Sequence, residues 1–259
     1  MMKLVKILFS KTNLFKNIKK CSVCEKRVKD FDFLNDYFFK KWQENEYTHS
    51  IFDLETFNFI NYSCPYCKSS DRDRLFAIFF KKVLKNQLNK KKINLLDFAP
   101  NPALTKMFKK FKNLNYRSVD LCSKHADDIA DITDLNIYKD NTFNVFLCSH
   151  VLEHVLDDRK AISELYRVLS PGGFGIVMVP IHLSFSKDYE KVGINSENER
   201  WKHFGQNDHV REYSKKGFIS KLKEPGFIVE EIKESYFGSS VFNKHGINSR
   251  STLYKVIKL

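Results

Sequence analysis

The sequence predicts an α/β fold built on a largely parallel sheet, and three observations point to it. From residue 76 onward, short apolar runs alternate with segments of helical spacing, as parallel strands and their crossover helices require. Several apolar runs end in an acid or another polar residue, where such a sheet exposes its ligand-binding edge. With 259 residues, 42% of them hydrophobic, the chain can form one such domain and a small additional segment.

The elements follow in order along the chain. Strands are expected, in sequence, at residues 93–98, 116–121, around 127–131, 142–150, 174–180, 227–235 and 251–259. Helices are expected at residues 75–88, 101–112, 157–170 and 213–224. The second helix has a strong start signal, because Asn101 can cap it and Pro102 suits the first helical position. The third helix is expected to stop at Pro171-Gly172-Gly173.

Two Cys-x-x-Cys pairs precede this alternating part. Cys21 and Cys24 form the first pair, and Cys64 and Cys67 form the second. Four thiolates satisfy tetrahedral Zn(II) and leave no open position, so the pattern predicts a structural zinc site. A redox Cys-x-x-Cys is the weaker alternative because a βαβ context is missing. Cys122 and Cys148 are expected to be small buried residues.

The expected organisation has three parts: a basic N-terminal arm at residues 1–19, a zinc-binding segment at residues 20–75 and the α/β domain at residues 76–259. The arm is expected to be a helix or frayed segment on the body, with a membrane-surface anchor as the alternative. It lacks a signal-peptide core, and no apolar run approaches the length of a membrane span, so a cytoplasmic location is expected. The oligomeric state is not predictable.

The net charge of +13 raises the question of nucleic-acid binding. Only nine of the 44 basic residues are Arg, the residue favoured for bidentate phosphate and base contacts. Lys is spread along the whole chain. A dispersed solvated surface therefore explains the charge better than a polyanion-binding face, and nucleic acid is not the favoured partner.

Three acids at successive strand ends predict a ligand site. Asp97 ends the first strand, Asp120 follows 23 residues later and Asp131 follows the third strand. The first spacing is close to that at which an acid accepts ribose hydroxyls in dinucleotide folds. The turn after Asp97 contains Ala99 and Pro100 but no glycine, so it is poorly suited to a pyrophosphate. A cofactor without phosphate fits this turn better than NAD or FAD.

The segment HVLEHVLDDRKAISELYRVLSPGG resembles class I S-adenosylmethionine-dependent methyltransferases of the small-molecule type. Other stretches resemble one bacterial subfamily in which a zinc-binding segment precedes the methyltransferase domain; these are CPYCKSSDRDR, LLDFAPN, YRSVDL, ADITDL, MVPI, ERWKHFGQNDHVREY and LYKVIKL. The resemblance extends from about residue 20 to the end. It implies a Rossmann-like, seven-stranded methyltransferase sheet with helices on both faces, preceded by a small zinc-binding segment.

The resemblance also implies roles for individual residues. The first cofactor loop, beside the methionine moiety, would comprise Asp97, Phe98, Ala99 and Pro100. The ribose and adenine contacts would come from Asp120, Leu121, Asp131 and Ile132. The far side of the cofactor would be lined by Ser149 and His150. Asn144 stands where relatives commonly have Asp, a position that is usually structural.

Histidines supply the candidates for proton transfer. Methyl transfer to a hydroxyl requires a base, and His150, His154 and His209 are the candidate catalytic residues, with Glu153 positioned to orient His154 or to cap a helix. His182, His209 and Arg211 are candidates for substrate binding.

The leading hypothesis is a methyltransferase that uses S-adenosylmethionine and a structural Zn(II), and acts on a hydroxyl of a sugar, glycan precursor or small metabolite. One alternative is an RNA methyltransferase with a zinc-binding recognition module. Against it, the fourth strand ends in CSHV rather than the Asn/Asp-Pro-Pro-aromatic pattern of many amino-directed base methylases. Another alternative is a binding module that has lost the cofactor. The sequence identifies neither the acceptor atom nor the general base.

Overall fold

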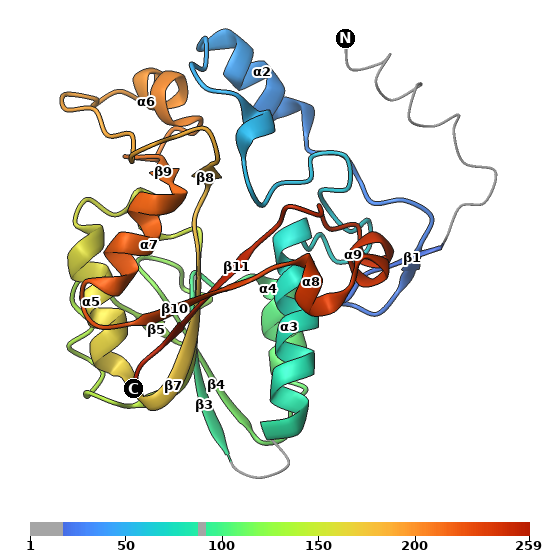
Figure 1. The fold of residues 1–259 in the computed structure, drawn as a ribbon, viewed down its shortest axis with the longest axis vertical. Helices are drawn as coiled ribbons and strands as arrows, with labels where there is room; N and C mark the ends of the chain where they lie inside the picture. The colour runs from blue at the N-terminus through green and yellow to red at the C-terminus, as the bar shows by residue number, and fades with distance from the viewer. Residues whose placement is uncertain (1–17, 88–91) are drawn as a thin grey trace.

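A seven-stranded sheet forms the centre of the protein (Figure 1). The computed structural model describes residues 18–87 and 92–259. The strands of this sheet are, in spatial order, β10 (Ile228–Ile232), β11 (Leu253–Ile257), β7 (Leu169–Met178), β6 (Phe143–Ser149), β3 (Ile93–Phe98), β4 (Leu114–Asp120) and β5 (Asp128–Ile129). Strands β3 to β7 pair in parallel, whereas β11 is antiparallel to both β7 and β10. The expected seven-stranded α/β fold is confirmed.

Helices cover both faces of the sheet (Figure 1). Helices α3 (Asp71–Gln87) and α4 (Pro102–Phe108) lie on one face, and α5 (Asp158–Val168) and α7 (Lys215–Lys223) lie on the other. The short helices α8 (Glu234–Phe237) and α9 (Ser239–His245) lie beside α3. The core between these layers is apolar and rich in Phe, for example at Phe80, Phe108 and Phe146, which are almost fully buried.

Local chemistry explains the helix starts. The side chain of Asn101 accepts hydrogen bonds from the backbone N–H groups of Ala103 and Leu104, and Pro102 follows it, so the predicted start of α4 is confirmed. Asp157 caps α5 through the N–H of Lys160. The apolar positions expected on α5 are all buried: Ala161, Ile162, Leu165, Val168 and the following Leu169.

The structure differs from the expected elements at a few points. Helix α3 begins at Asp71, before the expected position, because the polar residues Ser70 and Asp73 cap it through mutual side chain–backbone bonds. Pro171-Gly172-Gly173 does not separate a helix from a strand but lies within β7, whose pairing with β6 shifts there. Cys122 is exposed, which contradicts the expectation that it is buried, whereas Cys148 is buried as expected.

The N-terminal segment packs over the carboxyl ends of the strands. It contains the small hairpin β1 (Lys19–Lys20) and β2 (Arg27–Val28), the helix α2 (Asp36–Glu44) and the turn η1 (Ile51–Asp53). Leu54 forms a bridge to His182, and the indole N–H of Trp42 donates to the carbonyl of Gly205. The boundaries of the three expected parts stay predictions, and most of the basic arm lies outside the described residues.

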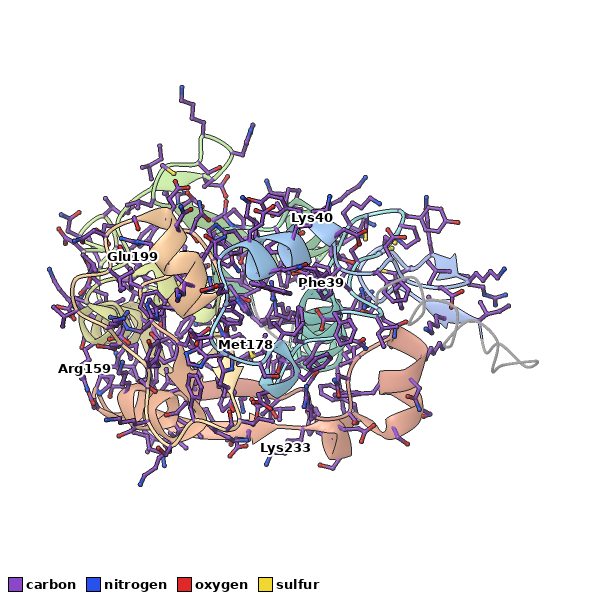
Figure 2. All side chains as sticks on the ribbon, turned by 90° about the horizontal axis from the view of Figure 1, so that it is seen from above. Phe39, Lys40, Arg159, Met178, Glu199 and Lys233 are labelled. Atoms are coloured by element: carbon purple, nitrogen blue, oxygen red, sulfur yellow. The ribbon has the colours of Figure 1, made fainter. Side chains whose placement is uncertain are left out.

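An insert between β7 and α7 completes this end of the molecule. It contains β8 (Ile181–His182), α6 (Glu197–Phe204) and β9 (Tyr213–Ser214). Figure 2 looks down on this end and labels Lys40 on α2, Glu199 on α6 and Met178 at the end of β7; helices α2 and α6 contact each other. No helix among the described residues is long and apolar enough to cross a bilayer, and a cytoplasmic location stays a prediction.

Candidate functional site

The carboxyl ends of the three central strands meet above the sheet. Because β3 lies between β4 and β6, Phe98 is paired with both Val119 and Cys148. The chain then turns sharply at Ala99, which has a φ of 49° and donates its N–H to the carbonyl of Val119. A left-handed turn without glycine is therefore formed here, and it carries the chain into α4.

A cavity of about 250 Å³ lies beside this turn, and we call it the Asp97 cavity. The residues used below to describe its lining are Tyr62, Arg72, Asp73, Asp97, Ala99 and Ser149. Asp97 and Asp73 are almost fully buried. Asp97 accepts a hydrogen bond of 2.8 Å from the hydroxyl of Tyr116, and Asp73 accepts one from the side-chain amide of Asn101. The cavity thus contains two buried acids close to a turn.

Burial sets the charge of Asp97. Removal from water raises the pKa of its carboxyl to about 7, and the nearby Asp73 adds to this effect, although the hydrogen bond from Tyr116 opposes it. Asp97 therefore titrates near neutral pH. A positively charged ligand in the Asp97 cavity would favour its ionised form.

Asp120 and Asp131 both cap their own turns. The Oδ1 atom of Asp120 accepts the N–H groups of Cys122 and Ser123 at 2.9 and 2.8 Å, and its Oδ2 accepts no hydrogen bond from the described residues. The Oδ1 atom of Asp131 accepts the N–H and hydroxyl of Thr133. Each carboxylate therefore has one oxygen fixed. Of the two apolar residues expected beside the adenine, Leu121 is exposed and Ile132 is buried.

His150 and Glu153 form a buried pair beyond β6. His150 has a φ of 56°, and its Nδ1 lies 2.8 Å from Oε1 of Glu153, which is 0% exposed. Burial lowers the pKa of His150 to about 4, and the Arg72 guanidinium contributes. Burial raises the pKa of Glu153, but the His150 ring outweighs this effect, so the net pKa falls to about 2. At neutral pH the ring is thus neutral and the carboxylate ionised.

A second cavity, which we call the His182 cavity, lies between the N-terminal segment and the insert. Its lining includes Tyr47, Tyr62, Arg72, His150, His182 and His209. His182 is 1% exposed, and its Nε2 lies 3.2 Å from both the Tyr47 hydroxyl and Oε1 of Glu212. Tyr62 and Arg72 line this cavity as well as the Asp97 cavity, so the two cavities adjoin.

The insert brings His209 and Arg211 to the turn that contains Glu153. The N–H of Val210 donates to the carbonyl of Glu153 at 2.9 Å. The guanidinium of Arg211 donates to several carbonyls of residues 152–156 and to Glu190, and is 5% exposed. Arg211 thus fixes the insert in place, and its expected contact with a substrate stays a prediction.

Sequence patterns alone did not single out Arg72 and Tyr62. Arg72 is half-buried and makes no hydrogen bond or ion pair with another described residue. Arg74, two residues later, donates to five backbone carbonyls: those of Asn61, Tyr62, Ser69, His245 and Gly246. The alternating charges of SSDRDR at a helix start were the available signal, because residues two apart on a helix face different neighbours.

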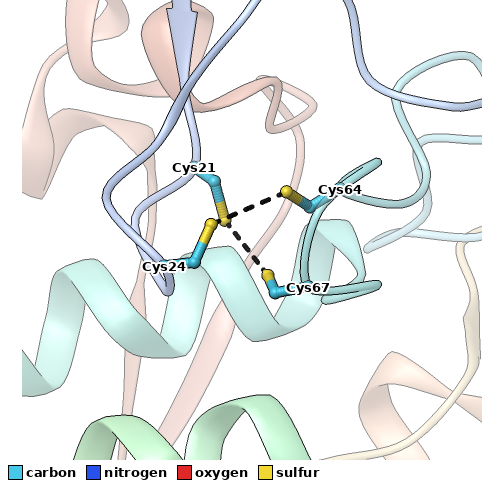
Figure 3. Close-up of side chains that lie close together, drawn as sticks. All are labelled: Cys21, Cys24, Cys64 and Cys67. Atoms are coloured by element: carbon cyan, nitrogen blue, oxygen red, sulfur yellow. Dashed lines mark hydrogen bonds between the residues drawn. The ribbon is translucent and has the colours of Figure 1, made fainter.

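The four cysteines of the N-terminal segment come together (Figure 3). The sulfur of Cys21 lies 3.7 Å from that of Cys67, and the sulfur of Cys24 lies 3.8 Å from that of Cys64. Tetrahedral zinc with Zn–S bonds of about 2.3 Å places its sulfurs about 3.8 Å apart. Hydrogen bonding to Cys67 and burial raise the pKa of the Cys21 thiol to about 12. The cluster therefore has the sulfur–sulfur spacing of a four-thiolate site. It would reach the charge state of such a site only with a cation bound.

The comparison with protein families concerns the central strands. Residues 82–177 match a family model described as a methyltransferase domain. The chain contains a methyltransferase domain. The match runs from the last part of α3 into β7 and so includes Asp97, Asp120 and the His150–Glu153 pair. The expected enzyme class is confirmed. No curated protein matches the chain.

Several solved structures are similar to this chain. The [4+2]-cyclase SpnF is 15% identical with a TM-score of 0.45, over 71% of this chain and 79% of that one. YcgJ from Bacillus subtilis is 12% identical with a TM-score of 0.44, over 70% and 99%. The Burkholderia thailandensis 1,6-didemethyltoxoflavin-N1-methyltransferase is 14% identical with a TM-score of 0.45, over 69% and 76%. Similarities this weak carry no argument about the chemistry of this chain.

Proposed function

We propose that this methyltransferase acts on a hydroxyl group of a sugar, a glycan precursor or another small metabolite. The observation that carries the proposal is the pair of adjoining cavities. The Asp97 cavity lies at the strand ends where this fold binds its ligands, and the His182 cavity continues from it past Tyr62 and Arg72. A donor and an acceptor can therefore meet at the boundary between the two.

The Asp97 cavity suits the amino-acid tail of S-adenosylmethionine. That tail has an ammonium and a carboxylate, and the cavity offers the acids Asp97 and Asp73 together with the unpaired guanidinium of Arg72. Asp97 would hold the ammonium, while Arg72 would hold the carboxylate in a bidentate contact. Ala99 and Pro100 need no glycine because no phosphate approaches them.

The rest of the cofactor would extend along the strand ends. The free Oδ2 of Asp120 would accept hydrogen bonds from the ribose hydroxyls, and Asp131 would accept one from the adenine amino group. The Ile132 backbone would lie near the adenine, and Leu121 would lie against its ring. Ser149 and His150 would lie on the opposite side. When bound, S-adenosylmethionine supplies an electrophilic methyl group on a positively charged sulfur.

His150 is the residue best placed to receive the proton of an acceptor hydroxyl. Its Nδ1 faces Glu153, so its Nε2 is available, and the ring lines the His182 cavity. The carboxylate orients the ring and stabilises its protonated form. Tyr47, His182 and Glu212 form a linked polar group on the opposite wall, which suits an acceptor rich in hydroxyls.

A Zn(II) ion in the four-cysteine cluster would have a structural role. Its thiolates fill a tetrahedral site, so no position remains for a substrate. The hydroxyl of Ser69 lies within hydrogen-bonding distance of the sulfurs of Cys21 and Cys67, and Arg74 lies nearby to balance the negative charge. Such an ion would hold the loop between residues 61 and 70 in place, and with it Tyr62 at the boundary between the cavities.

The first test is calorimetry with S-adenosylmethionine and its demethylated product. Micromolar binding to the full chain is expected. A second measurement follows methyl transfer to sugar nucleotides, to glycan fragments and to RNA. His150→Ala should abolish transfer to a hydroxyl acceptor and keep the affinity for the demethylated product. His125→Ala, a substitution in an exposed loop, serves as the control.

The outcomes separate the hypotheses. Failure to bind either ligand at millimolar concentration would contradict the cofactor site. Transfer to RNA, with an affinity that persists at physiological salt, would replace the small-molecule acceptor by RNA. Full activity of His150→Ala would remove this ring from proton transfer.

A further inference from the structure

A second cluster of metal-ligating side chains lies next to the proposed acceptor cavity. Glu153, His154 and His209 each offer one ligand atom, and these atoms lie within 4.8 Å of one another. The two rings meet edge to face with their centroids 4.7 Å apart. Glu153 and His154 belong to the turn after β6, and His209 belongs to the insert. The insert therefore assembles the cluster from distant parts of the chain.

The polar atoms of this cluster are not satisfied by the protein. Glu153 is fully buried, and although Nδ1 of His150 lies close to Oε1, neither carboxylate oxygen receives a hydrogen bond of good geometry from the described residues. Nε2 of His209, which is 3% exposed, also has no partner. An unsatisfied buried carboxylate is destabilising, because it loses its hydration without compensation. A cation among these atoms would remove that cost.

The histidines are oriented as metal ligands are. Nδ1 of His209 lies 3.1 Å from the carbonyl oxygen of Phe204, so it carries the proton, and Nε2 has the free lone pair. Nδ1 of His154 lies 3.2 Å from a carboxylate oxygen of Asp208. Metal-binding histidines usually donate their second N–H to a carbonyl or a carboxylate. Each ring thus has its Nδ1 close to a carbonyl or carboxylate oxygen, an arrangement that leaves Nε2 for a metal, and Nε2 of His209 is buried without a partner.

We propose that Glu153, His154 and His209 bind a divalent first-row metal ion, which holds the hydroxyl of the acceptor. Two imidazoles and a carboxylate form a donor set typical of zinc, iron or manganese with positions left open. Ligand atoms about 2.1 Å from a tetrahedral ion lie about 3.4 Å apart. The three ligand atoms lie within 4.8 Å of one another, and rotation of the side chains can bring them to this separation. The identity of the acceptor as a hydroxyl rests on the proposed function, whereas the binding of the metal ion does not.

The position of the site gives the metal a role. His209 lines the His182 cavity, as does His150, so an ion bound to His209 and Glu153 borders the acceptor cavity beside the proposed base. A bound cation lowers the pKa of a coordinated hydroxyl. The proton would pass to Nε2 of His150, and the electron pair left on the hydroxyl oxygen would form the new bond to the methyl carbon. The bond from that carbon to the cofactor's sulfur would break, and its electron pair would stay on the sulfur. A hydroxyl acceptor could then react near neutral pH.

Manganese binding provides the test, because four thiolates select zinc whereas Mn(II) accepts imidazole and carboxylate ligands. The full chain with its cysteine-bound zinc is titrated with Mn(II), and the free ion is followed by electron paramagnetic resonance. We expect one Mn(II) per chain. Glu153→Gln and His154→Ala should each weaken this binding by more than about a hundredfold, and Asp208→Asn should weaken it by about tenfold.

His203→Ala is the matched control, because this insert histidine contacts Tyr189 and Lys191 outside the cluster. It should bind Mn(II) as the unchanged chain does, and all variants should retain about one zinc and unfold cooperatively. Equal Mn(II) affinity in His154→Ala and the unchanged chain would overturn the proposal, as would no binding in the millimolar range. Titration with the demethylated cofactor is independent, so its failure would reject the proposed function and leave the metal result standing.

Discussion

The four-cysteine cluster and the carboxyl edge of the sheet are both dense in polar groups, but they differ in how far the protein satisfies those groups. Around the cysteines, Ser69 bonds to two sulfurs and Arg74 donates to five carbonyls. At the sheet edge, the carboxylate of Glu153 accepts no hydrogen bond of good geometry from the described residues. The guanidinium of Arg72 donates none to them.

This difference separates two uses of the same chemistry. Buried polar groups cost free energy unless they are paired. A cluster whose surroundings are paired therefore serves the fold, while unpaired groups beside a cavity remain available to a ligand from solution. The cysteine cluster and the Glu153 cluster would both bind a metal ion. Only at the Glu153 cluster would the ion keep open coordination positions and border a cavity. The following predictions test this contrast, from the largest expected effect to the smallest.

Removal of one cysteine should produce the largest effect. Cys64→Ser should lower the zinc content from about one per chain to none, and should destabilise the N-terminal segment by about 5 kcal/mol or more, because structural zinc binds with about 10–16 kcal/mol. Metal analysis and thermal unfolding measure both. Cys122→Ser changes an exposed thiol and should behave as the unchanged chain. Retained zinc in Cys64→Ser would contradict the four-thiolate site.

The two arginines of the first turn of α3 test the contrast directly. Arg74→Met should cost about 3 kcal/mol or more, because it leaves buried carbonyls without donors. Arg72→Met should leave the melting temperature nearly unchanged and weaken the cofactor by more than about tenfold. Thermal unfolding and calorimetry on the same samples separate the two. If Arg72→Met destabilised the fold as much as Arg74→Met, Arg72 would be structural.

The sequence predicted what depends on neighbours along the chain. Asn101 and Pro102 define the start of α4 locally, and paired cysteines predict a shared ion wherever their loops fold. It could not predict that His209 meets Glu153, because the contact depends on how a long insert packs. Arg211 shows the same limit: its charge suggested a substrate contact, which stays a prediction, but the sequence did not indicate the carbonyls to which it donates.

The ribose contact gives a smaller effect. Asp120→Asn keeps an oxygen for the N–H groups of Cys122 and Ser123, so the turn survives, but its amide cannot accept the ribose hydroxyls. The affinity for S-adenosylmethionine should fall by about 30-fold, as expected for hydrogen bonds to a charged acceptor. Asp134→Asn, in an exposed loop, is the control. An unchanged affinity would place the ribose elsewhere.

The pH dependence of cofactor binding should show the smallest effect, and it sharpens the account of Asp97. Burial raises the pKa of this carboxyl to about 7, so the group is mostly protonated below that pH and ionised above it. A ligand ammonium, whose pKa is about 8, stays charged across this range and prefers the ionised carboxylate. The affinity for S-adenosylmethionine should therefore fall about 15-fold between pH 7 and pH 5.5, because the ionised fraction of the Asp97 carboxyl falls from about one half to about 3%. Asp97→Asn should bind more weakly at pH 7 and lose this slope, while Tyr116→Phe should move the midpoint upward, since the phenol hydrogen bond favours the ionised form. Calorimetry across this pH range measures the slope, and an equal slope in Asp97→Asn would assign it to another group of the cavity.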